Sequence, residues 1–195
     1  MPSQSEPTMS EIRAFLGEIA RGLKSFDDEK IAPTIKRGPN KGKSYPAGAG
    51  SHEEPDQVSA IATRYGWAAN NISYSQGTCD LHQYGIWAEI KLIRPFNANG
   101  TRSRECADPV LGVVNDAKKL SLARDCARKM VVGLAYDKDK EGSTVMPFIN
   151  CVRVLARNHG VSLGEPILIS LGPLVHPVHR FGWVVGWEVF VDKTE

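Results

Sequence analysis

The chain has 195 residues, of which 42% are hydrophobic and 24% are charged, and its formal net charge is +2. These values are typical of a globular protein, and the length suits one domain with a sizeable core. Because the charge is close to neutral, bulk basicity is excluded as a sign of nucleic-acid binding, and any such sign must come from local clusters. The four cysteines lack CxxC spacing, which argues against a zinc knuckle or a disulfide framework.

Residues 1–9 are a polar segment that is expected to be disordered, and residues 10–195 are expected to form one domain. The amino-terminal segment lacks the basic and apolar regions of a signal peptide. No apolar run is long enough to span a bilayer. We therefore expect a cytoplasmic protein with reduced cysteines and no membrane partner.

The amino-terminal third is predicted to hold two helices separated by a long loop. Ser10 is suited to cap a helix over residues 11–26, in which apolar residues recur at helical spacing. Residues 31–55 are rich in Gly, Pro and Lys and show no periodicity, which predicts a long basic loop that is either functional or disordered. A shorter helix is predicted over residues 56–65.

The rest of the chain alternates between strand and helix patterns, so the predicted fold class is mixed α/β. The elements are expected in this order: strands at 71–75, near 79–81 and at 86–93; a loop at 95–104; a helix from Asp108 or from about residue 115 to about residue 128; a buried strand at 129–136; a helix from residue 143 or 144 to 160; and strands at 167–175 and 181–191. The central strand–helix–strand succession indicates a right-handed parallel crossover.

The alternation in residues 86–93 predicts a strand with two different faces. The core face would consist of Ile86, Ala88, Ile90 and Leu92, and the opposite face of Trp87, Glu89, Lys91 and Ile93. Burying an unpaired ion is costly, so a strand with a purely structural role rarely carries such charges. A turn over Leu81–Gly85 would fold Asp80 back beside Glu89. The two carboxylates and Lys91 would then form a site for a hard cation next to a positive charge.

The order Asp80, a spacer, then Glu89-Ile90-Lys91 resembles the signature of the PD-(D/E)XK nuclease superfamily, although Cys79 stands where the family has proline. The resemblance implies a restriction-endonuclease-like fold, with an αβββαβ core, a mixed central sheet flanked by helices, and here an additional carboxy-terminal helix and β-hairpin. It further implies a divalent-metal-dependent endonuclease that hydrolyses phosphodiester bonds, with DNA as the expected substrate.

The resemblance also assigns roles to residues. Asp80 and Glu89 would hold Mg²⁺ or Mn²⁺, the Ile90 carbonyl would be a further ligand, and Lys91 would orient or activate the attacking water. A glutamate of the first helix sometimes completes such sites, so Glu18 is a candidate metal ligand, with a solvated helix face as the open alternative. The alternative for Asp80, Glu89 and Lys91 is an exposed strand with an ion pair of little energetic value.

Local basic clusters offer candidate contacts with nucleic-acid phosphates. The candidates are Lys36, Arg37, Lys41, Lys43 and Arg180. The first four lie in the long loop with no acid among them, and an ordinary solvated loop is the open alternative. Arg180 belongs to a turn between the last two strands, which begins at His176. A further basic concentration between residues 118 and 129 is expected to be a solvated helix face.

A second class of function stays open at this point. A non-catalytic module that binds nucleic acid or protein and retains the nuclease fold would use the charged strand face as an interface. Trp183 and Trp187 would be its candidate anchors, since aromatic residues often dominate interface energetics, with a place in the core as the open alternative for both. The oligomeric state is open too, although a homodimer would suit double-strand cutting by a domain of this size.

Overall fold

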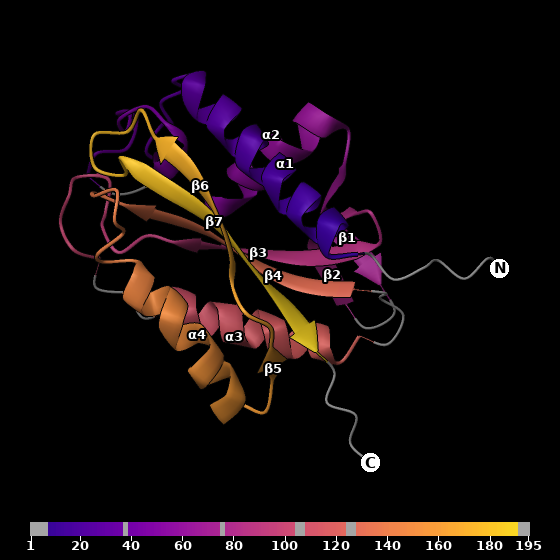
Figure 1. Cartoon of the computed structure of the whole chain (residues 1–195). Coiled ribbons are helices and arrows are strands. Elements are labelled where there is room, and N and C mark those ends of the chain that lie inside the picture. Colours follow the sequence, from indigo (N-terminus) through magenta and orange to yellow (C-terminus); the bar gives the residue numbers. More distant parts are fainter. Residues whose placement is uncertain (1–7, 37–38, 75–76, 104–107, 124–127, 191–195) are drawn as a thin grey trace, which may run out of the picture.

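The computed structural model describes residues 8–36, 39–74, 77–103, 108–123 and 128–190. The predicted disorder of residues 1–9 therefore lies almost wholly outside the described residues. In the described ranges the chain forms an α/β structure in which a mixed sheet separates two pairs of helices (Figure 1). None of the helices in these ranges is both long and apolar enough to cross a lipid bilayer.

The bounds of the elements agree with most of the predicted ones. The helices are α1 (Met9–Asp28), α2 (Glu54–Tyr65), α3 (Asp108–Ser121) and α4 (Met146–Asn158), with a 3-10 turn at Ala49–Ser51. The strands are β1 (Ala68–Tyr74), β2 (Gly77–Gln83), β3 (Ile86–Ile93), β4 (Arg128–Asp137), β5 (Ser162–Leu163), β6 (Ile167–Pro173) and β7 (Phe181–Phe190). The predicted strand at residues 86–93 is confirmed with the same ends.

The sheet is ordered β1-β2-β3-β4-β7, and β5 and β6 both pair with β7. The pairs β1–β2, β2–β3 and β4–β7 are antiparallel, whereas β3 and β4 are parallel and are connected through α3. The predicted parallel crossover is thus confirmed. Because α1 and α2 cover one face and α3 and α4 the other, both faces of the central strands are buried (Figure 1).

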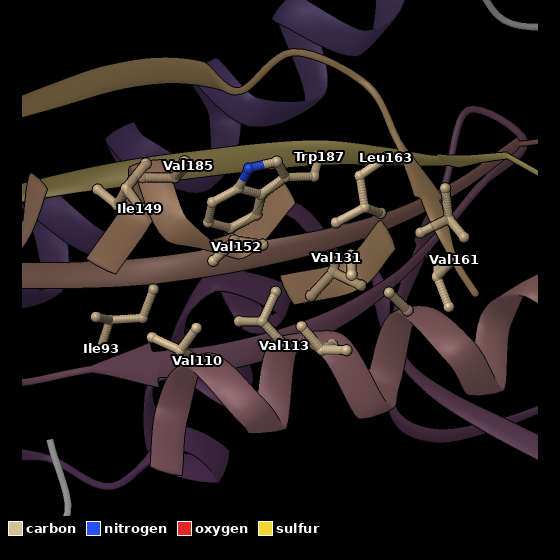
Figure 2. Packing of buried hydrophobic residues seen from close by; sticks show 14 of the residues in the cluster. Ile93, Val110, Val113, Val131, Ile149, Val152, Val161, Leu163, Val185 and Trp187 are labelled. Carbon is tan, nitrogen blue, oxygen red and sulfur yellow. The ribbon is translucent and has the colours of Figure 1, made fainter. Parts of the chain in front are cut away.

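Two hydrophobic cores result from this layering, one on each face of the sheet. The core under α1 and α2 includes Phe15, Leu16, Ile61, Ile86, Ala88 and Ile90. The core under α3 and α4, drawn in Figure 2, includes Ile93, Val110, Val113, Ile149, Val185 and Trp187. The predicted alternation of β3 is therefore confirmed. Trp187 is fully buried and Trp183 is 7% exposed. Their predicted role as interface anchors is wrong, because both side chains pack inside the chain itself.

Several boundaries differ from the prediction for local reasons. Thr8, not Ser10, caps α1, because the Thr8 hydroxyl accepts the Glu11 N–H while the Glu11 carboxylate accepts the Thr8 N–H. The turn after β2 is limited to Tyr84 and Gly85, both with positive φ, as a tight two-residue hairpin requires. Residues 81–83, predicted as part of the turn, continue the strand. Helix α3 ends at Ser121, earlier than predicted.

The end of α1 is joined to two distant segments by one buried side chain. Asp27 is fully buried, and its carboxylate accepts the backbone N–H of Ala49 at 2.9 Å and that of Val175 at 2.8 Å. The long connection between α1 and α2 is therefore tied to the loop between β6 and β7. It also contains a bridge between Thr34 and Ser44, so it is more ordered than its composition suggests.

Candidate active site

Strands β2 and β3 separate beyond their first three residue pairs. Their pairing runs from Gln83–Ile86 to Leu81–Ala88, and β3 then continues without β2 beside it. Two side-chain carboxylates accept hydrogen bonds from backbone amides of this part of β3. Asp80 Oδ2 accepts the Ile90 N–H at 2.7 Å, and Glu54 Oε2 accepts the Leu92 N–H at 3.0 Å. The result is a notch in the sheet, lined by side-chain carboxylates, and we call it the β2–β3 notch.

Glu89 lies beside this notch on the face that α3 covers. Its side chain is 7% exposed and forms an ion pair with Lys119 of α3. Burial is the main reason why the pKa of Glu89 is raised to about 7; the nearby Asp80 and Asp116 carboxylates also raise this pKa, whereas Lys119 lowers it. A nearby cation favours the ionised form of such a carboxyl group.

Lys91 points toward the same helix and is held between two acids. Its Nζ lies 3.1 Å from Asp116 Oδ2 and 3.5 Å from Glu54 Oε1. Burial alone would lower the pKa of Lys91, but the two carboxylates outweigh it and raise the pKa above its ordinary value. A methyl group on Gly112 would lie 3.2 Å from Lys91 Cδ, so this glycine of α3 makes room for the lysine stem. Lys91 is therefore a charged group of defined position.

The acids around the notch form a group that we call the carboxylate cluster. Its members are Glu54, Asp80, Glu89 and Asp116. Burial raises the pKa of Glu54 and of Asp116, and Asp80 adds to the increase at both. Two ammonium groups face four carboxylates here, so full ionisation leaves an excess of negative charge. Mutual repulsion of this kind favours binding of a further cation.

The carboxylates are at present occupied by groups of the protein itself. Asp80 and Glu54 accept backbone amides, and Glu89 pairs with Lys119. Among the described residues, no three His, Cys, Asp or Glu side chains are arranged as a ready-made metal site. A cation entering the notch would therefore have to displace these contacts.

The structure brings together three of the predicted site residues and leaves Glu18 elsewhere. Asp80 and Glu89 lie close enough for their charges to interact, and Lys91 lies beside them, held by Glu54 and Asp116. Glu18 instead accepts hydrogen bonds at 3.0 and 3.1 Å from the Tyr84 hydroxyl, at the tip of the β2–β3 hairpin. The helix-derived acid at the notch is Glu54, which sequence reasoning missed.

Asp116 and Lys119 were also missed, because the basic region after residue 115 was predicted to be a solvated face. Lys118 is exposed as expected, but Lys119 reaches Glu89, and Lys129 is buried and donates to the Ala123 carbonyl. A signal was present in the sequence. Residues 112, 116 and 119 recur at helical spacing and so share one face of α3, which combines a glycine with two opposite charges.

A cavity of about 840 Å³ opens next to Lys91. One wall comes from the connection between α1 and α2, and the other from the loop after β3, where Phe96 and Arg102 form a bridge. The lining includes aromatic and amide side chains, two cations and two acids: Asn40, Tyr45, Phe96, Asn97, Lys91, Arg94, Glu53 and Asp108. Because Lys91 and Leu92 line this cavity, it adjoins the β2–β3 notch.

Three of the predicted phosphate contacts belong to the loop beside this cavity. Lys36, Lys41 and Lys43 are exposed on the loop that forms its first wall, whereas Arg37 lies outside the described residues. Arg180 is exposed, and its guanidinium carbon lies 5.9 Å from the centre of the Phe181 ring. These positions keep the loop lysines available for a polyanion.

Two histidines of the predicted turn are structural. His176 and His179 are buried and stacked, with ring centres 4.6 Å apart. His176 Nδ1 accepts the backbone N–H groups of Val178 and His179, and His179 Nε2 donates to the Phe96 carbonyl at 2.9 Å. Burial lowers the pKa of each imidazole to about 4. Both rings are neutral at physiological pH and join the β6–β7 loop to the cavity wall.

Comparison of the chain with family models, with curated proteins and with solved structures finds no match in any of the three. The geometry of the notch and of the cavity beside it is therefore the basis for any functional conclusion.

Proposed function

We propose that this protein is a divalent-metal-dependent nuclease of restriction-endonuclease-like fold that hydrolyses phosphodiester bonds, with DNA as its expected substrate. The observation that carries the proposal is the β2–β3 notch. There Asp80 lies opposite Glu89 across two diverging strands, and Lys91 occupies the next position on the same face of β3. An acid pair and a lysine in this arrangement suit hydrolysis of a phosphodiester.

The order of elements supports the proposal independently. Helix α2, strands β1 to β3, helix α3 and strand β4 follow one another as the αβββαβ core requires. The sheet places β3 between antiparallel β2 and parallel β4, so the charged strand is central. Helix α1, helix α4 and the β6–β7 hairpin are additions to that core. A chance Asp…Glu-x-Lys spacing would have no reason to coincide with this topology.

The donor chemistry of the notch fits Mg²⁺ or Mn²⁺. Carboxylate and carbonyl oxygens are the ligands that these hard cations prefer, and Asp80, Glu89 and the Ile90 carbonyl would provide them. A bound ion of this type neutralises charge on the phosphate and makes a water molecule more acidic.

The protein's own groups would supply position and charge. Glu54 and Asp116 hold the Lys91 ammonium in place. In that position the ammonium would orient a water molecule or a phosphate oxygen. The exposed Lys36, Lys41 and Lys43 would attract the polyanion and set its path past the notch.

Plasmid DNA incubated with the purified chain and Mg²⁺ or Mn²⁺ tests the proposal. We expect cutting by the native chain and none by Lys91→Ala. Because Lys91 is partly exposed and its ion pairs stabilise the fold by no more than about 1 kcal/mol, the melting temperature should change little. Lys118→Ala is the matched control, since Lys118 is an exposed lysine of α3. Undiminished cutting by Lys91→Ala would remove Lys91 from the mechanism.

One observation favours a second candidate, a non-catalytic module that binds nucleic acid or protein. The ammonium of Lys119 already neutralises Glu89, which is how a retained but inactive site would look. Mn²⁺ separates the two candidates. A metal site should raise the melting temperature on Mn²⁺ addition, because binding to the folded state stabilises it, and Asp80→Ala should lose that gain. A module without a metal site should show no Mn²⁺ effect in either variant.

A further inference from the structure

The cavity beside Lys91 has the size and position of a binding pocket rather than of a packing gap. Its volume of about 840 Å³ falls within the range of small-molecule sites, which is roughly 300–1,000 Å³. It begins at Lys91 and Leu92, where β3 leaves the notch, and is walled by two segments distant in sequence. A ligand in it would therefore touch the candidate active site directly.

The lining combines aromatic rings with amides. Tyr45 is 38% exposed, and Phe96 lies across from it on the second wall with Lys138 Nζ 3.8 Å from its ring centre. Asn40 and Asn97 add amide groups, one from each wall. Rings stack on flat heterocycles, and amides bond to their polar edges. The chemistry suits a planar polar ring.

Two charged groups of the lining are already partnered within the chain. The Arg94 guanidinium donates to the Gly50 and His52 carbonyls and pairs with Glu53. Lys91 is held by Glu54 and Asp116. The cavity therefore offers little to a free anion. Exposed positive charge follows the lining residues Ile35 and Asn40 directly in the chain, on Lys36 and Lys41.

We propose that this cavity receives an unstacked nucleobase while the loop lysines hold the phosphates on either side of it. The inference rests on the proposed function and narrows its substrate to single-stranded or locally opened nucleic acid. A base in an intact duplex is stacked and paired, and cannot enter a side pocket without leaving the helix. Tyr45 is the stacking platform, and the phosphate next to the captured base lies beside Lys91.

Binding measured by fluorescence anisotropy in EDTA tests the inference without any cleavage. The probes are a labelled single-stranded oligonucleotide, its fully paired duplex, and an abasic strand of equal length. We expect the single strand to bind most tightly. Tyr45→Ala should weaken its binding about tenfold, which is the scale of one lost base–aromatic stack, and Tyr45→Phe should not. The abasic strand should bind weakly to every variant.

Tyr84→Ala is the matched control, because Tyr84 is a similarly exposed tyrosine that does not line the cavity. It should leave all three affinities unchanged. Duplex binding as tight as single-strand binding would overturn the inference, as would an equal effect of Tyr45→Ala on normal and abasic strands.

The outcome is distinguishable from failure of the proposed nuclease. Selective single-strand binding that depends on Tyr45, in a chain that never cuts DNA, would support the pocket and remove the hydrolytic function. Metal-dependent cutting that requires Lys91, together with base-independent binding, would support the nuclease and overturn the pocket.

Discussion

At the scale of single residues, the two lysines of the site differ in the acids with which they form ion pairs. Lys91 is shared by two acids that are not its strand neighbours, whereas Lys119 is paired with the most buried acid of the cluster. Under the proposed function, Lys119 therefore occupies Glu89 in competition with a metal ion. It acts as an internal counterion until that ion arrives.

Replacing Lys119 should consequently strengthen metal binding. Lys119→Met removes the competing ammonium while keeping an apolar stem. Because a partly exposed ion pair of this kind is worth about 1 kcal/mol, we expect Mn²⁺ to bind roughly fivefold more tightly, as measured by isothermal titration calorimetry. Lys118→Met removes the same charge from the neighbouring exposed position and should have a smaller effect. Weaker Mn²⁺ binding by Lys119→Met would show that Lys119 supports the site instead.

The sequence could predict the grouping of Asp80, Glu89 and Lys91 because the three residues belong to one hairpin. Strand alternation and a tight turn determine their relative positions almost without help from the rest of the fold. Glu54 and Asp116 could not be placed in the same way. They reach the notch from helices whose docking depends on the whole core, and tertiary packing leaves little trace in local sequence.

At the scale of elements, the carboxy-terminal turn of α1 breaks a local rule. Asp27 and Asp28 place negative charge where the helix dipole disfavours it. The reason is tertiary, since the Asp27 carboxylate accepts amides from two other segments. An acid at the carboxy-terminal end of a helix, as Asp27 is, can thus indicate a long-range contact.

We expect Asp27→Ala to destabilise the fold by about 2–4 kcal/mol, because it leaves one buried and one partly buried amide without acceptors. Asp28→Ala is the natural comparison. Asp28 is exposed and forms an ion pair with Lys24 one turn earlier in α1, so its loss should change stability by less than about 0.5 kcal/mol. Urea unfolding followed by circular dichroism measures both. Equal values for the two variants would contradict the role assigned to Asp27.

Most elements could be predicted from periodicity, and the errors have physical causes. Strand β3 is predicted correctly because its alternation is long and uninterrupted. Strand β5 is missed because it has two residues, too few to produce a pattern. The predicted end of α3 is too late because no glycine or proline follows Ser121 to mark the stop.

At the scale of the whole molecule, two buried imidazoles make stability depend on pH. His176 and His179 have a pKa of about 4 in the folded chain, because burial disfavours the charged ring, against an ordinary value of 6.5. Between these values the unfolded chain binds more protons than the folded one. Their contribution to stability is therefore present above about pH 6.5 and is lost as the pH falls toward 4.

We expect the free energy of unfolding to decline over that interval in the native chain. The decline should be shallower in a variant carrying His176→Asn and His179→Asn, whatever its absolute stability. His159→Asn, at an exposed histidine after α4, should keep the native slope. Chemical unfolding at a series of pH values measures the slopes. Parallel curves for all three chains would show that the buried rings do not titrate in this way.

The β2–β3 notch has a consequence for the hydrogen bonds of the central strand β3. Elsewhere in the sheet, an amide proton is shared with a carbonyl oxygen, which has no charge to lose. At Ile90 and Leu92 the acceptors are side-chain carboxylates, those of Asp80 and Glu54. Under the proposed function, a bound cation would use the same carboxylate oxygens that accept the Ile90 and Leu92 amides. Binding at the notch would therefore change the hydrogen bonds of β3 itself.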